Sequence, residues 1–226
     1  SKENLATFCN GEKISTPETV VVREPGKFQS AIDEIGFPLY VKGVFYDAYK
    51  CTTLTDASRH YDDLRKKWGF PILLQKPVKG EEFDICCVGG KNGELLGSVA
   101  IRKMGLTDKG KAWSAITIRN QKLTEFSEYI LKKLKWNGPC ELEIIVEERT
   151  GELYLLEINP RFPAWIFLCT GAEQNLPNLV VDLALGKEVS PLPPAKSGMT
   201  FVRHATDMIC PLDYIENLTI HGELHY

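Results

Sequence analysis

The sequence predicts an α+β fold built from two lobes, and three observations support this prediction. Between residues 19 and 75, short apolar runs typical of strands alternate with two stretches of helical periodicity. After Gln75, longer apolar runs are joined by glycine-containing turns, which favours antiparallel hairpins. The 226 residues are 43% hydrophobic and 25% charged, so the chain can bury a sizeable core and is neither disordered nor fibrous.

The first lobe is expected to run strand, helix, strand, strand, helix, strand. Phe28, Ile32 and Ile35 recur at helical spacing before a glycine stop at Gly36, and a second helix is expected to start at the cap Thr55. The strands are predicted at 19–22, 39–42, 51–54 and 72–74, and the second helix is predicted to end at Gly69.

The second lobe is expected to combine two hairpins with helices. Apolar runs at 83–88 and 95–101 flank an Asn-Gly pair, which is a strong hairpin signal. The glycines at 89–93 are not a phosphate loop, because a strand rather than a helix follows them. Helices are predicted at 124–136 and from Pro177 to Gly186, and Pro193-Pro194 marks a break before the C-terminal segment.

Charge, cysteine content and hydropathy exclude several classes of protein. The chain has 27 basic and 30 acidic residues with no basic block, so we expect no nucleic-acid partner. Seven cysteines show no metal-binding spacing and are interpreted as reduced packing residues. No apolar run approaches the ~20 residues that cross a bilayer, and no leader is apparent. We therefore expect a cytoplasmic protein without a membrane partner.

The stretch from Cys140 to Arg161 carries the chemistry. Two extended runs flank Arg149-Thr150-Gly151, which suits a three-residue hairpin loop with Gly151 in the left-handed region. That loop would place Glu148 opposite Glu152. Counting back along the strands then pairs Glu143 with Glu157, and Glu141 with Asn159.

Because side chains alternate along a strand, Glu157 and Asn159 share one face, and Glu143 lies across from Glu157 on that face. Two carboxylates and an amide oxygen form the kind of oxygen cluster that Mg²⁺ accepts together with substrate phosphates. The alternative is that both glutamates are solvated residues on the exposed face of a hairpin. A two-residue loop would shift the register and turn Glu143 away from Glu157.

The run Glu157-Ile158-Asn159-Pro160-Arg161 resembles the E-x-N-x-R signature of ATP-grasp domains of the carbamoyl phosphate synthetase and biotin carboxylase type. The similarity extends from about Lys2 to about Gly186. It implies an ATP-grasp fold whose two lobes close on MgATP. It further implies that Glu143, Glu157 and Asn159 hold one or two Mg²⁺, or Mn²⁺, and that Arg161 steadies the transferred phosphoryl group as a catalytic residue.

Other segments match the same family in order, and the resemblance assigns them roles toward ATP. Phe37–Lys42 resembles the strand whose terminal lysine contacts phosphate, so Lys42 takes that binding and catalytic role. Glu82, in a G-x-E-aromatic run, is implied to bind the ribose. The remaining implied nucleotide contacts are Gln75, Lys76 and Val78 at the adenine hinge and Lys2 at the phosphates. Without the resemblance, each of these residues would be interpreted as an ordinary surface residue.

Two departures from the family pattern stand out. The segment Gly43–Lys50, where the family has a glycine-rich flap, contains one glycine. The α/β domain that precedes the position of Lys2 in the family is missing here, so a further domain in cis or a partner chain in trans is expected to complete the substrate side. The basic segment beginning at Arg102 and Lys103 is expected to be a solvated loop, with contact to an anionic substrate or closure over the phosphates as the alternatives.

The resulting organisation is an N-terminal segment (1–18), a small lobe (19–75), a large lobe with the metal site (76–190) and a C-terminal extension (191–226). The resemblance implies an ATP-dependent ligase that activates a small-molecule carboxylate as an acyl phosphate for attack by an amine or similar nucleophile, such as a thiol. Two alternatives remain: a nucleotide-binding module without turnover, and a phosphotransferase acting on a hydroxyl. The acceptor is not readable from the sequence.

Overall fold

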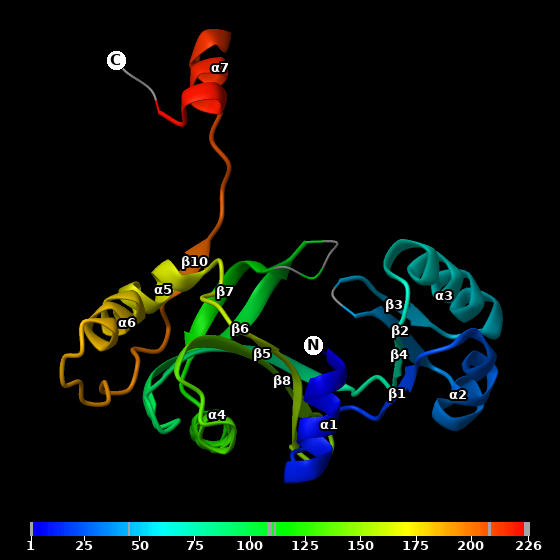
Figure 1. Cartoon of the computed structure of the whole chain (residues 1–226). Coiled ribbons are helices and arrows are strands. Elements are labelled where there is room, and N and C mark those ends of the chain that lie inside the picture. Colours follow the sequence, from blue (N-terminus) through cyan, green and yellow to red (C-terminus); the bar gives the residue numbers. More distant parts are fainter. Residues whose placement is uncertain (1, 45, 108–109, 111, 208, 224–226) are drawn as a thin grey trace.

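The structure is a computed structural model that describes residues 2–44, 46–107, 110, 112–207 and 209–223. Two sheets form two lobes, and helix α1 (Lys2–Glu12) packs on the large lobe at the end nearer the small lobe (Figure 1). The predicted α+β class is therefore confirmed. Four residues within expected loops, Phe45, Asp108, Lys109 and Lys111, fall outside the described part of the chain.

The small lobe is a four-stranded antiparallel sheet in the order β1-β4-β2-β3. Its strands are β1 (Thr19–Val22), β2 (Leu39–Gly43), β3 (Ala48–Cys51) and β4 (Ile72–Gln75). The 3₁₀ turn η1 (Pro25–Lys27) leads into α2 (Phe28–Ile35), and α3 (Leu54–Trp68) follows β3. Both α-helices pack on one face of the sheet, because their apolar stripes and the inward strand residues form a single buried cluster.

The third predicted strand and its helix cap are displaced by several residues. The strand is Ala48–Cys51 rather than 51–54, and the cap is Thr53 rather than Thr55. The Thr53 hydroxyl accepts the backbone N–H of Asp56, which satisfies one of the free donors at the start of α3. Because β3 begins at Ala48, the last three residues of the expected flap segment, 48–50, belong to this strand.

The large lobe is a six-stranded antiparallel sheet in the order β10-β7-β6-β5-β8-β9. Helix α4 (Gln121–Leu134) and α1 cover one face, while α5 (Ile166–Gly171) and α6 (Leu176–Ala184) cover part of the other. The strands are β5 (Gly80–Gly89), β6 (Leu95–Leu106), β7 (Ala112–Ile118), β8 (Gly138–Glu147), β9 (Leu153–Asn159) and β10 (Thr200–Val202).

A one-residue bulge sets the register of the β8–β9 hairpin. The Glu147 N–H bonds the Glu152 carbonyl, so the turn contains four residues, and the expected pair of Glu148 with Glu152 is wrong. From that turn, a regular ladder would place Leu156 opposite Glu143. Leu156 instead has no cross-strand partner, and the ladder resumes with Glu143 opposite Glu157. The predicted pairs Glu143–Glu157 and Glu141–Asn159 are therefore confirmed, although the predicted turn is not.

The C-terminal helix α7 (Leu212–His221) projects away from both lobes and has no buried residue (Figure 1). Six of the seven cysteines are buried, in line with the packing role expected for them. Among the described residues, none of the helices combines the length and the apolar character that a membrane span requires.

Candidate nucleotide and metal site

Carboxylates from three neighbouring strands form a row on the face of the large sheet that lies opposite α4. Asp84 on β5 is paired with Glu143 on β8, which is paired with Glu157 on β9. Further along the sheet, this face carries Cys86, Val99 and Ile101 in a buried cluster with α5. One face of the sheet therefore serves as core at one end and presents acidic side chains at the other.

Asn159 is oriented by the carboxylates beside it. Its amide nitrogen donates to Oε1 of Glu143 at 2.9 Å and to Oε2 of Glu141 at 3.3 Å. This orientation follows from the chemistry, because an amide oxygen facing two carboxylates would be repelled. The amide oxygen of Asn159 is turned away from them and accepts no hydrogen bond from the described residues. The set of Glu143, Glu157 and Asn159 thus offers oxygen donors of the type that fit Mg²⁺.

The Glu143 carboxyl ionises less readily than that of an ordinary glutamate. Burial raises the pKa of Glu143 to about 6, and the charge of Glu157 acts in the same direction, whereas Lys103 opposes the shift. A divalent cation would favour the ionised forms of both carboxylates and remove their mutual repulsion. The electrostatics of the pair therefore fit a metal site better than a pair of solvated surface glutamates.

Arg161 lies two residues after the end of β9 and is fixed at one of its nitrogens. Its Nη1 donates to Oε2 of Glu141 at 2.9 Å and to the Phe162 carbonyl at 3.3 Å, while the side chain remains 56% exposed. A guanidinium held in this way keeps donors directed outward for an anion, because it presents five N–H groups in a rigid fork. The sequence argument paired Glu141 with Asn159 but gave Glu141 no role.

Lys42 extends from the small lobe toward the same carboxylates. Its Nζ donates to Oε1 of Gln75 at 2.5 Å, and the Gln75 amide in turn donates to the Thr19 hydroxyl at 2.9 Å. Burial lowers the pKa of Lys42, and the charge of Lys2 adds to that shift. Glu157, Glu143 and Glu82 act in the opposite direction. Lys42 of the small lobe is thus electrostatically coupled to predicted site residues of the large lobe and to Lys2 of α1.

Lys2 lies near the carboxylate row at the start of α1. A hollow of about 330 Å³ beside β9 brings Lys2 together with Glu157. It is also lined by Asn4, Leu5, Phe8, Leu134, Trp136, Ile158 and Pro160. The helix is held there because Leu5, Phe8 and Cys9 pack on the apolar face of the large sheet. A basic residue close to the metal ligands is consistent with the predicted phosphate contact.

The hinge residues Lys76 and Val78 contribute differently from the other predicted site residues. The Lys76 ammonium donates to the carbonyls of Ile35 and Gly36, so it caps the C-terminus of α2. The backbone N–H of Lys76 bonds the Glu18 carbonyl at 2.9 Å. Val78 is half-buried in the connection between β4 and β5. The expected adenine contacts of these two residues stay predictions.

Glu82 forms an ion pair with Lys103, which the sequence assigned to a solvated loop. That expectation is wrong for Lys103, because the residue lies in β6 and its side chain is only 11% exposed. Its ammonium also lies 3.0 Å from the Asp84 carboxylate, which is buried. Burial alone would lower the pKa of Lys103, but the carboxylates of Asp84 and Glu82 outweigh that effect and raise it.

Glu82, Asp84 and Glu143 bring carboxylate oxygens within 4.8 Å of one another. This spacing would suit a cation, but the Lys103 ammonium already supplies the positive charge that Asp84 and Glu82 need. Glu143 belongs both to this cluster and to the predicted metal set. If a cation binds here, we therefore expect it on the Glu157 side of Glu143, where the amide oxygen of Asn159 adds a neutral donor.

The segment expected to act as a flap connects β2 and β3 and is tied to α3. Oδ2 of Asp47 accepts from the Lys67 ammonium and from the Trp68 indole, each at 2.9 Å. The Gly43 N–H bonds the Asp47 carbonyl, and a Cβ on Gly43 would lie 2.5 Å from the Tyr46 carbonyl oxygen. The single glycine of the segment is therefore required by a close backbone approach within the hairpin itself.

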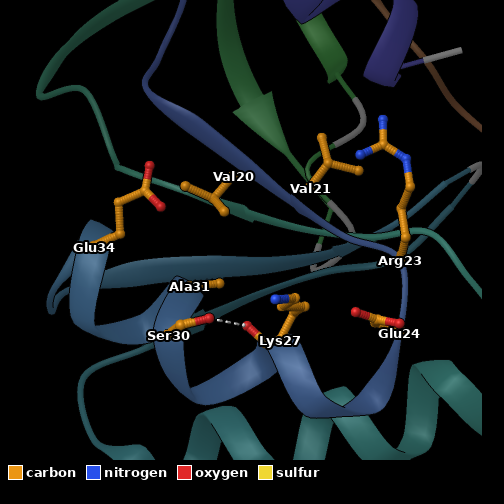
Figure 2. A pocket seen from close by; sticks show the side chains of 8 residues that line it. All are labelled: Val20, Val21, Arg23, Glu24, Lys27, Ser30, Ala31 and Glu34. Atoms are coloured by element: carbon orange, nitrogen blue, oxygen red, sulfur yellow. Dashed lines mark hydrogen bonds between the residues drawn. The ribbon is translucent and has the colours of Figure 1, made fainter.

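A separate hollow of about 510 Å³ lies on the small lobe between β1 and α2 (Figure 2). Figure 2 shows Val20 and Val21 on the strand side, and Ser30 donating to the Lys27 carbonyl on the helix side. None of the predicted site residues lines it. This hollow therefore lies apart from the carboxylate row.

Solved structures with the same architecture define the class of this protein. N5-carboxyaminoimidazole ribonucleotide synthetase from Thermus thermophilus superposes with a TM-score of 0.73 and 18% identity over 98% of this chain and 61% of that one. A biotin carboxylase from Campylobacter jejuni superposes with a TM-score of 0.71 and 13% identity, over 88% of this chain and 49% of that one. At these identities the likeness shows the fold alone, which is the ATP-grasp fold.

Sequence comparison gives the narrower assignment. Residues 70–207, more than half of the chain, match the family described as ATP-grasp in the biosynthetic pathway with Ter operon, and the chain belongs to that family. The carbamoyl phosphate synthase large chain of Thermoanaerobacter pseudethanolicus is 26% identical over 200 residues. The D-alanine–D-alanine ligase of Rickettsia felis is 27% identical over 113 residues.

The match covers only part of each relative. It includes 82% of this chain but 18% of the synthase, and 44% of this chain but 34% of the ligase. The predicted family resemblance is confirmed by these comparisons, whereas they do not test the individual site residues.

Proposed function

We propose that the chain is the nucleotide-binding part of an ATP- and Mg²⁺-dependent ligase that activates a carboxylate as an acyl phosphate. The observation that carries this proposal is the meeting of Glu143, Glu157 and Asn159 on one hairpin, with Lys42 electrostatically coupled to the two glutamates. Carboxylate and amide oxygens beside basic side chains form the donor set that a metal-bound triphosphate requires.

The proposed reaction has two steps. An oxygen of the substrate carboxylate attacks the γ-phosphorus of ATP, the bond from that phosphorus to the bridging oxygen breaks, and ADP leaves. An amine or similar nucleophile then attacks the acyl carbon, inorganic phosphate departs, and the nucleophile loses a proton. Neither step needs a nucleophile from the protein, so binding, orientation and charge neutralisation are the tasks left to this chain.

The residues divide these tasks according to their positions. Bound Mg²⁺ would neutralise charge on the β- and γ-phosphates, and Glu143, Glu157 and Asn159 would hold it. Lys42 would bind phosphate oxygens from the small lobe and Lys2 from helix α1, and the exposed part of the Arg161 guanidinium would face the transferred phosphoryl group. Gln75, Lys76, Val78 and Glu82 keep their proposed contacts with adenine and ribose. If Glu82 binds ribose, it must release Lys103, which Asp84 still holds.

The known activities named for the relatives support a ligase. They include a synthase, a D-alanine–D-alanine ligase and a biotin carboxylase determined with an ATP analogue. Because the chain spans only part of each relative, we propose that a further domain in cis or a partner chain in trans contributes to the acceptor side.

Transfer of ¹⁸O tests the chemistry directly. Candidate carboxylates carrying ¹⁸O would be incubated with ATP, Mg²⁺ and a panel of amines and thiols, and the released phosphate would be analysed by mass spectrometry. We expect one ¹⁸O atom in the phosphate, since acyl phosphate formation moves a carboxylate oxygen onto phosphorus. Unlabelled phosphate at the background rate for every pair would contradict the proposal, and a phosphorylated alcohol would favour a phosphotransferase.

A nucleotide-binding module without turnover is the second candidate, and the glycine-poor flap segment favours it. Only Gly43 in that segment lacks a Cβ, so few backbone N–H groups can approach a phosphate closely. Saturable ATP binding without release of ADP, in the presence of the full substrate panel, would favour this candidate over the ligase.

A further inference from the structure

Glu141 is a buried carboxylate to which the sequence argument gives no role. It lies on β8, on the same face as Glu143, with 5% of its surface exposed. Its Oε1 accepts the indole N–H of Trp165 at 3.0 Å. Its Oε2 accepts Nη1 of Arg161 at 2.9 Å and the amide of Asn159 at 3.3 Å.

These contacts divide between the two oxygens in a way that fixes the carboxylate. Trp165 is itself buried in the cluster that joins the large sheet to α5 and α6, so its N–H is a rigid donor. Oε1 is bonded there, and Oε2 is held separately at the end of β9 by its own two donors, Arg161 and Asn159. A carboxylate removed from water requires such partners, and a guanidinium with two neutral donors meets that need.

The two side chains on Oε2 both belong to the proposed site. The bond to Asn159 turns the amide nitrogen toward the acidic side chains and the amide oxygen away from them. The bond to Arg161 holds one end of a guanidinium that is otherwise exposed. One fixed carboxylate thereby sets the orientation of a metal donor and of a phosphate donor together.

We propose that Glu141 is a positioning residue that orients Asn159 and Arg161 toward the metal-bound phosphates. This inference rests on the proposed function for its effect on turnover. Its structural part, the orientation of the two side chains, does not depend on turnover. The competing explanation is that Glu141 only satisfies the buried Trp165 indole.

The test compares Glu141→Gln, the shorter acid Glu141→Asp and the matched control Trp165→Phe. The control removes the third donor to Glu141 and leaves Arg161 and Asn159 in place. The amide of Gln cannot accept at both ends, so we expect kcat to fall about 10- to 100-fold with little change in the KM for ATP. Glu141→Asp should recover part of kcat, and Trp165→Phe should stay closer to the wild-type enzyme.

A double-mutant cycle with Arg161→Ala separates positioning from general damage. If Glu141 acts through Arg161, adding Glu141→Gln to Arg161→Ala should lower kcat by less than Glu141→Gln alone does. Multiplicative losses, or an equal loss in Trp165→Phe, would overturn the proposal. Circular dichroism and thermal unfolding of each variant identify any that has not folded, and Glu141→Asp then carries the comparison.

Crystal structures of wild type and Glu141→Gln provide a readout that needs no turnover. We expect Asn159 or Arg161 to change its side-chain orientation while Glu143 and Glu157 stay paired. Unchanged orientations of both would overturn the positioning role, even in an active enzyme. If Glu141→Gln shows the expected reorientation but the wild type turns over no ATP with any substrate, the result would instead count against the proposed function.

Discussion

Glu143 lies directly opposite Glu157 across β8 and β9, although the turn that joins the strands would by itself place Leu156 there. The bulge at Leu156 moves the ladder by one residue, so that Glu157 and Asn159 face the same side of the sheet as Glu143. Register is therefore part of the site, because a shift of one residue would turn either donor toward the core cluster that contains α4.

Two single-residue deletions test this relationship. Deleting Leu156 removes the unpaired residue, so Glu157 stays opposite Glu143, and we expect the variant to retain Mg²⁺-dependent ATP binding. Deleting Ile158 makes Glu157 and Asn159 neighbours, which places them on opposite faces. We expect binding to be lost in that variant, as measured by calorimetric titration. Equal affinities in the two deletion variants would argue against a register-dependent site.

Replacing Glu157 by Gln should abolish ATP turnover and leave the fold intact. The substitution removes one of the two anionic metal ligands and keeps the size of the side chain. The control is Glu148→Gln, in the turn of the same hairpin, where the carboxylate pairs with Lys79. Coupled assays of ADP release should show near wild-type rates for the control, and a similar rate in Glu157→Gln would refute the metal assignment.

Stability should depend on pH through Asp84. Burial raises the pKa of Asp84 to about 7, with Glu143 and Glu141 adding to the shift and Lys103 opposing it. In the unfolded chain its pKa is about 3.9, so between these values the folded state holds a proton that the unfolded state has lost. The free energy of unfolding should therefore decrease as pH rises from about 4 to about 7. The decrease is about 1.4 kcal/mol for each pH unit over which the two states differ by one proton.

Asp84→Asn removes this contribution, so its unfolding free energy should vary less over the same range. Urea denaturation at several pH values measures both proteins. A smaller slope will persist in the variant, because the pKa of Glu143 is also raised, to about 6. Parallel curves for the wild type and Asp84→Asn would show that the Asp84 carboxyl does not titrate as described.

Asp47→Ala should loosen the hairpin between β2 and β3. The substitution leaves the Trp68 indole and the Lys67 ammonium without their shared acceptor, for an expected loss of about 1–3 kcal/mol. Asp47 has φ of 67°, a conformation that Asn tolerates well, so Asp47→Asn should lose less. Urea unfolding checks the order of the variants. Equal stability of all three proteins would remove Asp47 as an anchor of this segment.

The predicted pairing of the two glutamates is correct because two features that the sequence does not reveal, a longer turn and a bulge, cancel each other. Alternation and the position of the glutamates indicate the correct face. The turn is one residue longer than expected because the Glu147 carboxylate accepts the N–H groups of Arg149 and Thr150. Such local side-chain bonds change a loop by a residue without any change in hydrophobic pattern, and the bulge at Leu156 restores the register.

Other differences reflect tertiary packing. The segment that forms α1 contains Asn10-Gly11, a turn signal, and only weak periodicity, so no helix was predicted there. It is helical because its apolar side chains reach the core of the large lobe. Asn120 caps α4 through its side chain, and Lys135 in the left-handed conformation ends it, which displaces the predicted helix of 124–136.

The roles of Glu141, Asp84 and Lys103 could not be read from local sequence. Each depends on a partner from another element: Trp165 for Glu141, and β6 beside β5 for the two others. Alternation does place Glu82 and Asp84 on one face, and this was the available signal for an acidic cluster on β5. Nothing in the spacing indicated that a lysine on the next strand would neutralise it.

Anomalous diffraction from crystals soaked with Mn²⁺ and a non-hydrolysable ATP analogue tests the central claim most directly. We predict a manganese peak at coordination distance from oxygens of Glu157 and Asn159, with Glu143 as a third ligand and the triphosphate completing the shell. A peak between Glu82 and Asp84, or no peak while the nucleotide is bound, would contradict the account of a metal-bound triphosphate held by the β8–β9 hairpin.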